Sequence, residues 1–199
     1  MIPVACQPEP ATFDENVRQP GAAFLRWTPQ PTNKDFKRHN YWQKALLDLQ
    51  RAYGGICAYS AMWLHPVGSV DHFVPKSANP PLAYEWSNFR LTSERLNNYK
   101  ADATDLIDPF DVQPGWFELD LATFFVRPGS GLPADLEAKI ARTIETLRLN
   151  HDALVQQRFD IAKEYADGNV NLQYLLNRYP FIGSELLRNN QHESIKGTL

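Results

Sequence analysis

The sequence predicts an α+β fold, and three observations lead to it. The chain has 199 residues, of which 43% are hydrophobic and 22% are charged, so it holds enough apolar material for a packed core. Apolar residues recur at helical spacing after residue 41 and again in the C-terminal third of the chain. Between these regions, short apolar runs interrupted by turn residues are typical of strands. We therefore expect a small strand-containing centre flanked by helices.

Composition and charge restrict the surroundings and partners of the chain. There are 20 Lys and Arg against 23 Asp and Glu, which gives a net charge of −3 and excludes a generally basic coat for nucleic acid. Any contact with nucleic acid must use a local patch. The two cysteines, Cys6 and Cys57, cannot form a disulfide framework and fit a reducing compartment. With no visible signal peptide and no membrane span, we expect a cytoplasmic protein without a membrane partner.

The N-terminal third divides into an arm and a helix. Six of the fifteen prolines lie between Pro3 and Pro31, so residues 1–33 are expected to form an extended arm, broken at most by a short helix near residues 22–27. Apolar residues spaced three or four apart predict a helix over 41–53, with Asn40 as its N-cap. Basic residues gather over 34–51. A solvated helix face and a phosphate-facing patch explain them equally well.

The middle of the chain predicts the order strand, loop, strand, helix. Short strands are expected over 61–64, 70–74 and 89–92. Ser93 then offers an N-cap for a helix that carries Asn97 and Lys100.

The remaining chain is expected to extend this centre. Residues 101–120 hold six acids and no Lys or Arg, a composition typical of a solvated stretch or a surface for a basic partner. Residues 117–127 predict a strand or hairpin, and helical stripes follow Pro133. The predicted parts are therefore an arm (1–33), a core with its preceding helix (34–110), and a hairpin with a helical extension packed on the core (111–199).

Asp71 and His72 stand together at the end of a predicted strand. A carboxylate is a hard oxygen ligand for a cation such as Mg²⁺, and a neutral imidazole takes a proton from water near pH 7. Alone, such a pair is more often structural or solvated. Three residues downstream strengthen the functional interpretation: Asn88 precedes the next strand, and Asn97 and Lys100 share one face of the following helix. A base, a cation site and a positive side chain together suit the hydrolysis of a phosphodiester.

The stretch 53–102 resembles HNH endonucleases of the His-Me finger, or ββα-metal, superfamily. The matching segments are Gly-Gly-Ile-Cys-Ala-Tyr (54–59), Val-Asp-His-Phe-Val-Pro-Lys-Ser (70–77), Leu-Ala-Tyr-Glu-Trp-Ser-Asn (82–88) and Asn-Asn-Tyr-Lys-Ala-Asp (97–102). The resemblance implies a ββα-metal core that cuts phosphodiesters with one divalent cation, Mg²⁺ or Mn²⁺. The chain is also similar to bacterial HNH proteins associated with retrons and other anti-phage systems.

The resemblance implies a role for each residue of the set. His72 corresponds to the general base, and Asn88 to the middle asparagine, which we expect to orient the imidazole through its carbonyl. Asp71 and Asn97 correspond to the metal ligands. Lys100 is expected to supply a positive charge to the phosphate.

The sequence departs from this family at the two Cys-x-x-Cys knuckles that bind a structural zinc in many members. Here the knuckles read Cys57-Ala58-Tyr59-Ser60 and Ser93-Glu94-Arg95-Leu96, so one of four thiolates remains. A structural zinc ion needs four ligands. We expect no structural zinc, with Cys57 as a small buried residue.

The favoured function is a metal-dependent DNA endonuclease, plausible in anti-phage defence. Two alternatives stay open, a catalytically silent module that binds nucleic acid or protein, and a ribonuclease that uses the same site. Because the net charge gives little long-range attraction for a polyanion, we expect a partner protein such as an ATPase or sensor, or a homo-oligomer. The basic segment 34–51 and the acidic segment 102–120 are the expected contact surfaces.

Overall fold

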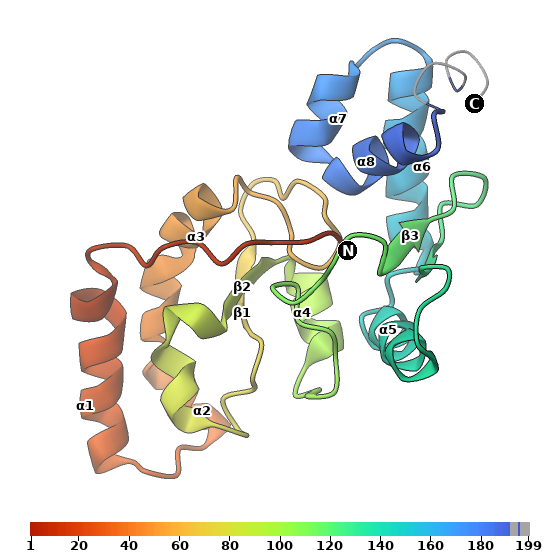
Figure 1. Cartoon of the computed structure of the whole chain (residues 1–199). Coiled ribbons are helices and arrows are strands. Elements are labelled where there is room, and N and C mark those ends of the chain that lie inside the picture. The colour runs from red at the N-terminus through yellow and green to blue at the C-terminus, as the bar shows by residue number, and fades with distance from the viewer. Residues whose placement is uncertain (192–194, 196–199) are drawn as a thin grey trace. The chain divides into compact units, whose positions relative to one another are not determined.

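The computed structural model describes residues 1–191 and 195, and it has an α+β fold of helices and two small antiparallel sheets. Figure 1 follows the chain from its N-terminus to α8. The chain divides into two compact units. The first comprises Ala5–Cys57 and Leu64–Thr104, and the second comprises Met1–Val4, Ala58–Trp63 and Asp105–Leu199. Each unit is described by itself.

The first unit holds one antiparallel strand pair surrounded by short helices. Its elements, in chain order, are η1 (Asp14–Arg18), α1 (Gln19–Trp27), α2 (Asn33–Arg38), η2 (Tyr41–Ala45), α3 (Leu46–Ala52), β1 (Ser69–His72), η3 (Pro80–Tyr84), η4 (Trp86–Asn88), β2 (Phe89–Thr92) and α4 (Glu94–Lys100).

The short helix predicted near residues 22–27 is present as the C-terminal part of α1, but the N-terminal segment is not otherwise an extended arm, because residues 14–21 are helical too and the segment takes part in the core. Phe13 and Val17 are buried in the same hydrophobic cluster as β1 and β2. Pro20 lies in the first turn of α1, where a missing N–H is tolerated. Gly21 lets α1 lie directly against Tyr84, since a Cβ at this position would stand 2.2 Å from the Tyr84 Cγ. The predicted boundary at residue 34 therefore does not separate an arm from a core.

The helix predicted over 41–53 is present as the 3₁₀ turn η2 followed by α3. Asn40 does not cap it through its side chain. The capping box lies one helix earlier, where Thr32 accepts a hydrogen bond from the Asp35 backbone N–H and the Asp35 carboxylate accepts one from Thr32.

The order strand, loop, strand, helix is confirmed for β1, β2 and α4. β1 and β2 are antiparallel, with His72 opposite Phe89. The Ser93 hydroxyl accepts a hydrogen bond from the Leu96 N–H and starts α4, as its position predicts. β1 ends at His72 rather than at residue 74, because the Val74 N–H donates to the Asn88 side chain instead of to a strand.

The strand predicted over 61–64 is absent. Residues 58–63 belong to the second unit, where the Trp63 N–H donates to the Arg178 carbonyl at the end of α7, a distance of 2.8 Å. Trp63 takes part in an isolated β-bridge, but residues 61–64 do not form a strand.

The second unit contains the predicted hairpin and C-terminal helices. Its elements are β3 (Phe117–Leu119), β4 (Val126–Pro128), α5 (Ala134–Thr146), α6 (Asp152–Ala166), α7 (Leu172–Arg178) and α8 (Pro180–Arg188). The Arg158 side chain is buried among them and donates to the carbonyls of Phe124 and Leu149 at 3.0 and 2.7 Å. This unit begins at residue 105 in its main part, so the predicted boundary at 110/111 lies a few residues late. Among the described residues, none of the helices has the length and apolar character required to cross a lipid bilayer.

Candidate functional site

Asp71 and His72 end β1 and point to opposite faces of the strand pair, as successive residues of a strand do. Asp71 contacts Lys100 of α4, and His72 contacts Ala83 of η3. Both side chains are buried, with 2% and 4% of their residue surface exposed. The two groups that the sequence places side by side therefore have separate environments.

The hydrogen bonds of His72 define its tautomer. Nε2 lies 2.9 Å from the Ala83 carbonyl oxygen, which only accepts hydrogen bonds, so Nε2 carries the proton. Nδ1 then holds the lone pair. The Lys76 ammonium, a donor, lies 3.4 Å from this nitrogen. The imidazole is thus neutral, with its basic nitrogen directed toward Lys76.

Two aromatic rings fix the plane of the imidazole. Trp42 and Phe89 meet it edge-on, with ring centroids 4.9 and 5.2 Å away. Burial, and next to it the positive charge of Lys76, lowers the pKa of His72 from 6.5 to about 3. The unprotonated form therefore dominates at neutral pH, and so low a pKa also makes Nδ1 a weak base while Lys76 lies beside it.

Asp71 is paired with a cation from its own fold. Lys100 Nζ lies 3.1 Å from Asp71 Oδ1 and donates to the His72 carbonyl at 2.7 Å. The Lys100 side chain is 0% exposed. This corrects the prediction that Lys100 serves the phosphate, since a fully buried ammonium between two internal oxygens cannot contact a substrate. Lys100 neutralises Asp71 and ties α4 to the end of β1.

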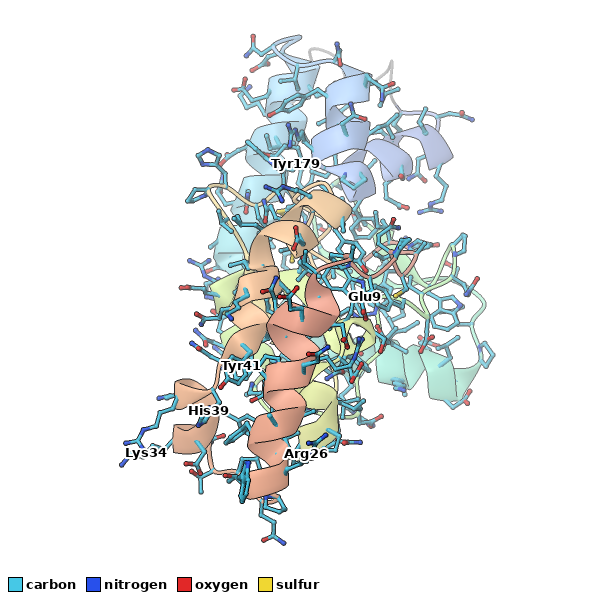
Figure 2. The ribbon with its side chains drawn as sticks, turned by 90° about the vertical axis from the view of Figure 1, so that its left-hand side faces the viewer. Glu9, Arg26, Lys34, His39, Tyr41 and Tyr179 are labelled. Atoms are coloured by element: carbon cyan, nitrogen blue, oxygen red, sulfur yellow. The ribbon has the colours of Figure 1, made fainter. Side chains whose placement is uncertain are left out.

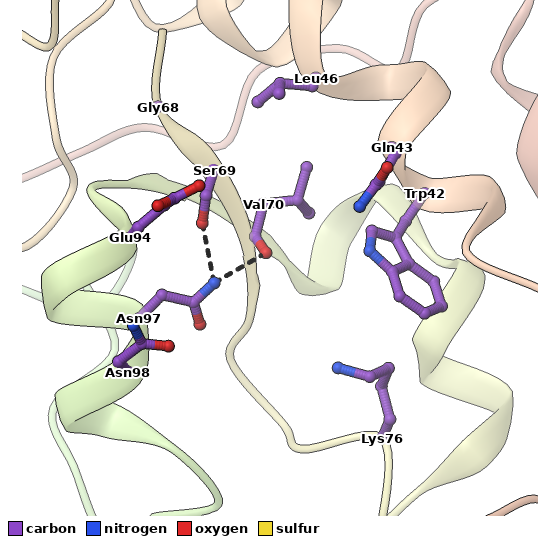
Figure 3. A pocket seen from close by; sticks show the side chains of 10 residues that line it. All are labelled: Trp42, Gln43, Leu46, Gly68, Ser69, Val70, Lys76, Glu94, Asn97 and Asn98. Atoms are coloured by element: carbon purple, nitrogen blue, oxygen red, sulfur yellow. Dashed lines mark hydrogen bonds between the residues drawn. The ribbon is translucent and has the colours of Figure 1, made fainter. Parts of the chain in front are cut away.

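Asn97 lies at the edge of a cavity of about 470 Å³, and Figure 3 shows this arrangement. Its side-chain NH₂ donates to Ser69 Oγ at 2.8 Å and to the Val70 carbonyl at 3.2 Å. Both donors of the amide are thereby used, and the amide oxygen is left as an acceptor beside the cavity. The residues that line this cavity come from η2, α3, β1, α4 and the loops next to β1: Trp42, Gln43, Leu46, Gly68, Ser69, Val70, Lys76, Glu94, Asn97 and Asn98.

Asn88 does not contact the imidazole, contrary to the expected orienting role. Its amide oxygen accepts from the Val74 N–H at 2.8 Å, and its NH₂ donates to the carbonyls of Val74 and Leu82, both at 3.0 Å. Asn88 therefore ties the segment after β1 to η3. The carbonyl that accepts from His72 belongs to Ala83, the next residue of η3 after Leu82.

Sequence reasoning undervalued Lys76 and missed two other contributors. Lys76 lies 5.0 Å above the Trp42 ring as well as beside His72. Its place four residues after His72, in the segment 70–77 that carries the resemblance, was a usable signal. In the sequence, Trp42 is only one of the apolar residues whose spacing predicts the helix over 41–53. The Ala83 carbonyl leaves no signal in a sequence, since every residue has one.

The predicted metal ligands, Asp71 and Asn97, are not brought together on one surface. The amide oxygen of Asn97 suits a hard cation such as Mg²⁺. Asp71 does not line the cavity, and its carboxylate is neutralised by Lys100. Within residues 1–191 and 195, no three His, Cys, Asp or Glu side chains form a metal-binding group. In this arrangement the pair does not fit a shared cation. Cys57 is buried, with its thiol 3.4 Å from Thr92 Oγ1.

No protein-family model matches the chain, and the comparison with curated proteins finds no match either.

Proposed function

We propose that the first unit is the core of a metal-dependent HNH endonuclease that hydrolyses phosphodiester bonds, with a ββα-metal fold over β1, β2 and α4. The observation that carries this proposal is the state of His72 at the end of β1. Its Nε2–H is held by the Ala83 carbonyl, and its Nδ1 lies 3.4 Å from the ammonium of Lys76, a residue that lines the cavity. This tautomer leaves Nδ1, and not Nε2, as the nitrogen that could take a proton.

In this proposal, His72 activates the attacking water. Nδ1 takes a proton from water as the water oxygen forms a bond to phosphorus, the bond to the leaving oxygen breaks, and that oxygen is protonated from solvent. The Ala83 carbonyl stabilises the resulting imidazolium through Nε2–H. Mg²⁺ or Mn²⁺ belongs to the proposal, with the Asn97 oxygen as a ligand. Asp71 would join that ligand set only in a state where Lys100 releases it.

The partner in this proposal is nucleic acid. DNA is preferred to RNA because of the resemblance to HNH endonucleases. Support comes from α2, where Lys34, Lys37 and Arg38 are exposed while Phe36 is buried. Figure 2 shows Lys34 extending away from the helix. The neighbouring Asp35 is occupied in the capping box, so the outer face of α2 is basic. Because the net charge of the chain is −3, contact with nucleic acid needs a local basic patch, and the outer face of α2 provides one. A role in anti-phage defence and a partner ATPase, sensor or second copy extend the same proposal.

One observation favours the second candidate, a catalytically silent binding module. The Asp71–Lys100 ion pair satisfies a carboxylate that the metal site needs. In a silent module, this pair and the basic face of α2 would be the features retained.

A panel of nucleic acids separates the candidates. The purified chain is incubated with linear duplex DNA, single-stranded DNA and RNA, each with Mg²⁺, Mn²⁺ or EDTA, and products are resolved on denaturing gels. Cleavage that depends on either metal supports the nuclease, and the substrate that is cut distinguishes DNA from RNA. Binding to the same nucleic acids without cleavage in any metal would establish the silent module instead.

A further inference from the structure

The cavity beside Asn97 is large enough for part of a nucleotide, and most of its polar groups are neutral. Its volume of about 470 Å³ falls within the range of small-molecule sites. Gln43, Ser69, Asn97 and Asn98 provide amide and hydroxyl groups around it. Among the lining side chains, Lys76 supplies the positive charge and Glu94 the negative charge. As Figure 3 shows, the Lys76 ammonium points into the space between these groups.

Lys76 separates this cavity from the basic nitrogen of His72. Its Nζ lines the cavity and at the same time lies 3.4 Å from Nδ1. His72 itself does not line the cavity and is buried. In this arrangement the lone pair of Nδ1 is occupied by the ammonium, and a water molecule in the cavity does not reach it.

The direct contacts of the Lys76 ammonium are with neutral groups, the His72 imidazole and the face of Trp42, 5.0 Å from the ring centroid. The carboxylates of Asp71 and Asp102 attract it from a longer distance. Within the described part of the chain, Lys76 forms no ion pair, in contrast to Lys100. A hydrogen bond to an anionic oxygen is roughly twice as strong as a hydrogen bond between neutral groups. The flexible four-carbon stem of a lysine allows the ammonium to change partner without a backbone movement.

We propose that Lys76 is the phosphate-binding residue of this cavity, and that a phosphodiester entering it draws the ammonium from His72 Nδ1 onto a phosphate oxygen. The same movement uncaps Nδ1 beside the bound phosphate and admits the attacking water. This inference rests on the proposed function, because it takes His72 as the base. It adds a contact between Lys76 and the phosphate of the substrate. It also explains why Lys76 lies against the Nδ1 nitrogen of His72 before a phosphate binds.

Binding without cleavage tests the phosphate contact. A labelled single-stranded oligonucleotide is titrated in EDTA with wild type, Lys76→Met and Lys139→Met, and fluorescence anisotropy is read at several salt concentrations. Lys139 is the matched control, since it lies on α5 of the second unit. Lys76→Met should weaken binding on the order of 10- to 100-fold, the effect of losing a charge-assisted hydrogen bond. The slope of log K against log salt should fall by about 0.7, the value for one phosphate contact on a single strand. Lys76→Arg keeps the charge and should bind within a few-fold of wild type.

Nitrogen NMR of the His72 ring tests the cap. In the free wild type, the Nδ1 resonance should carry the shift of a nitrogen that accepts a hydrogen bond. Lys76→Met should shift it toward the position of a nitrogen that has lost a charged donor, and adding the oligonucleotide to the wild type should shift it in the same direction, because water is a weaker donor than an ammonium. A Lys76→Met protein with an unchanged Nδ1 resonance, or with wild-type affinity and salt slope, would overturn the inference. Neither result would affect the proposed function, which fails if no nucleic acid is cleaved or if cleavage is independent of His72.

Discussion

Replacing Lys100 by methionine is predicted to destabilise the first unit strongly while leaving nucleic-acid affinity unchanged. Methionine fills a similar volume, so the main change is electrostatic. Asp71 then remains buried without the cation 3.1 Å from its Oδ1, and the His72 carbonyl loses a donor at 2.7 Å. Removing one partner of a buried ion pair costs about 3–5 kcal/mol, because the other charge stays desolvated and uncompensated.

Urea unfolding followed by tryptophan fluorescence measures this loss. With a slope of about 2 kcal/mol per molar urea, the midpoint should fall by about 1.5–2.5 M. The double variant Asp71→Leu/Lys100→Met is the control, because replacing both charges by apolar groups removes the buried charge altogether. It should recover most of the lost stability. A Lys100→Met midpoint within 0.5 M of wild type, combined with weakened nucleic-acid binding, would refute the structural role and restore the phosphate role predicted from the sequence.

Two further predictions follow from the same site. Burial lowers the pKa of His72 from 6.5 to about 3. Below pH 6.5 the unfolded chain therefore binds a proton at His72 that the folded chain does not bind, so the free energy of unfolding falls as the pH falls. Between pH 7 and pH 5 the wild type should therefore lose about 2 kcal/mol more than His72→Gln, measured by urea unfolding at each pH; equal losses would contradict the buried neutral imidazole. Asn88→Ala removes three hydrogen bonds and should cost about 2–4 kcal/mol, with faster hydrogen exchange at the Val74 amide. A variant with wild-type exchange there would show that the loop is held without Asn88.

The hairpin and helix around the site were predictable because local signals agree with one another there. The apolar run at 89–92, the Ser93 cap and the spacing of Asn97 and Lys100 all indicate the same elements. Of the N-terminal helices, only the part near residues 22–27 was predicted, and the turn over 14–18 and the burial of this segment were not. Its prolines favour an extended chain locally, and burial of Phe13 and Val17 against distant residues overrides this preference.

The roles of the two lysines show where spacing stops being informative. Asn97 and Lys100 are three residues apart on α4, which correctly places them on one face. The spacing of the two residues does not indicate whether that face of α4 is exposed to solvent or packs against the end of β1. Lys100 points inward to Asp71, while Lys76, on a loop without periodicity, reaches His72 and the cavity. The tautomer of His72 depends on the Ala83 carbonyl, a backbone group that only the folded chain positions.

The most direct measurement of the central claim is the single-turnover cleavage rate of His72→Gln relative to wild type, on whichever nucleic acid the wild type cuts. Glutamine keeps a side-chain NH₂ for the Ala83 carbonyl but has no basic nitrogen in place of Nδ1, so the fold is retained and the base is lost. If His72 activates the attacking water, the rate should fall about 10²–10⁴-fold, with thermal unfolding and oligonucleotide affinity close to those of wild type. A folded His72→Gln protein that cleaves at the wild-type rate would contradict the account.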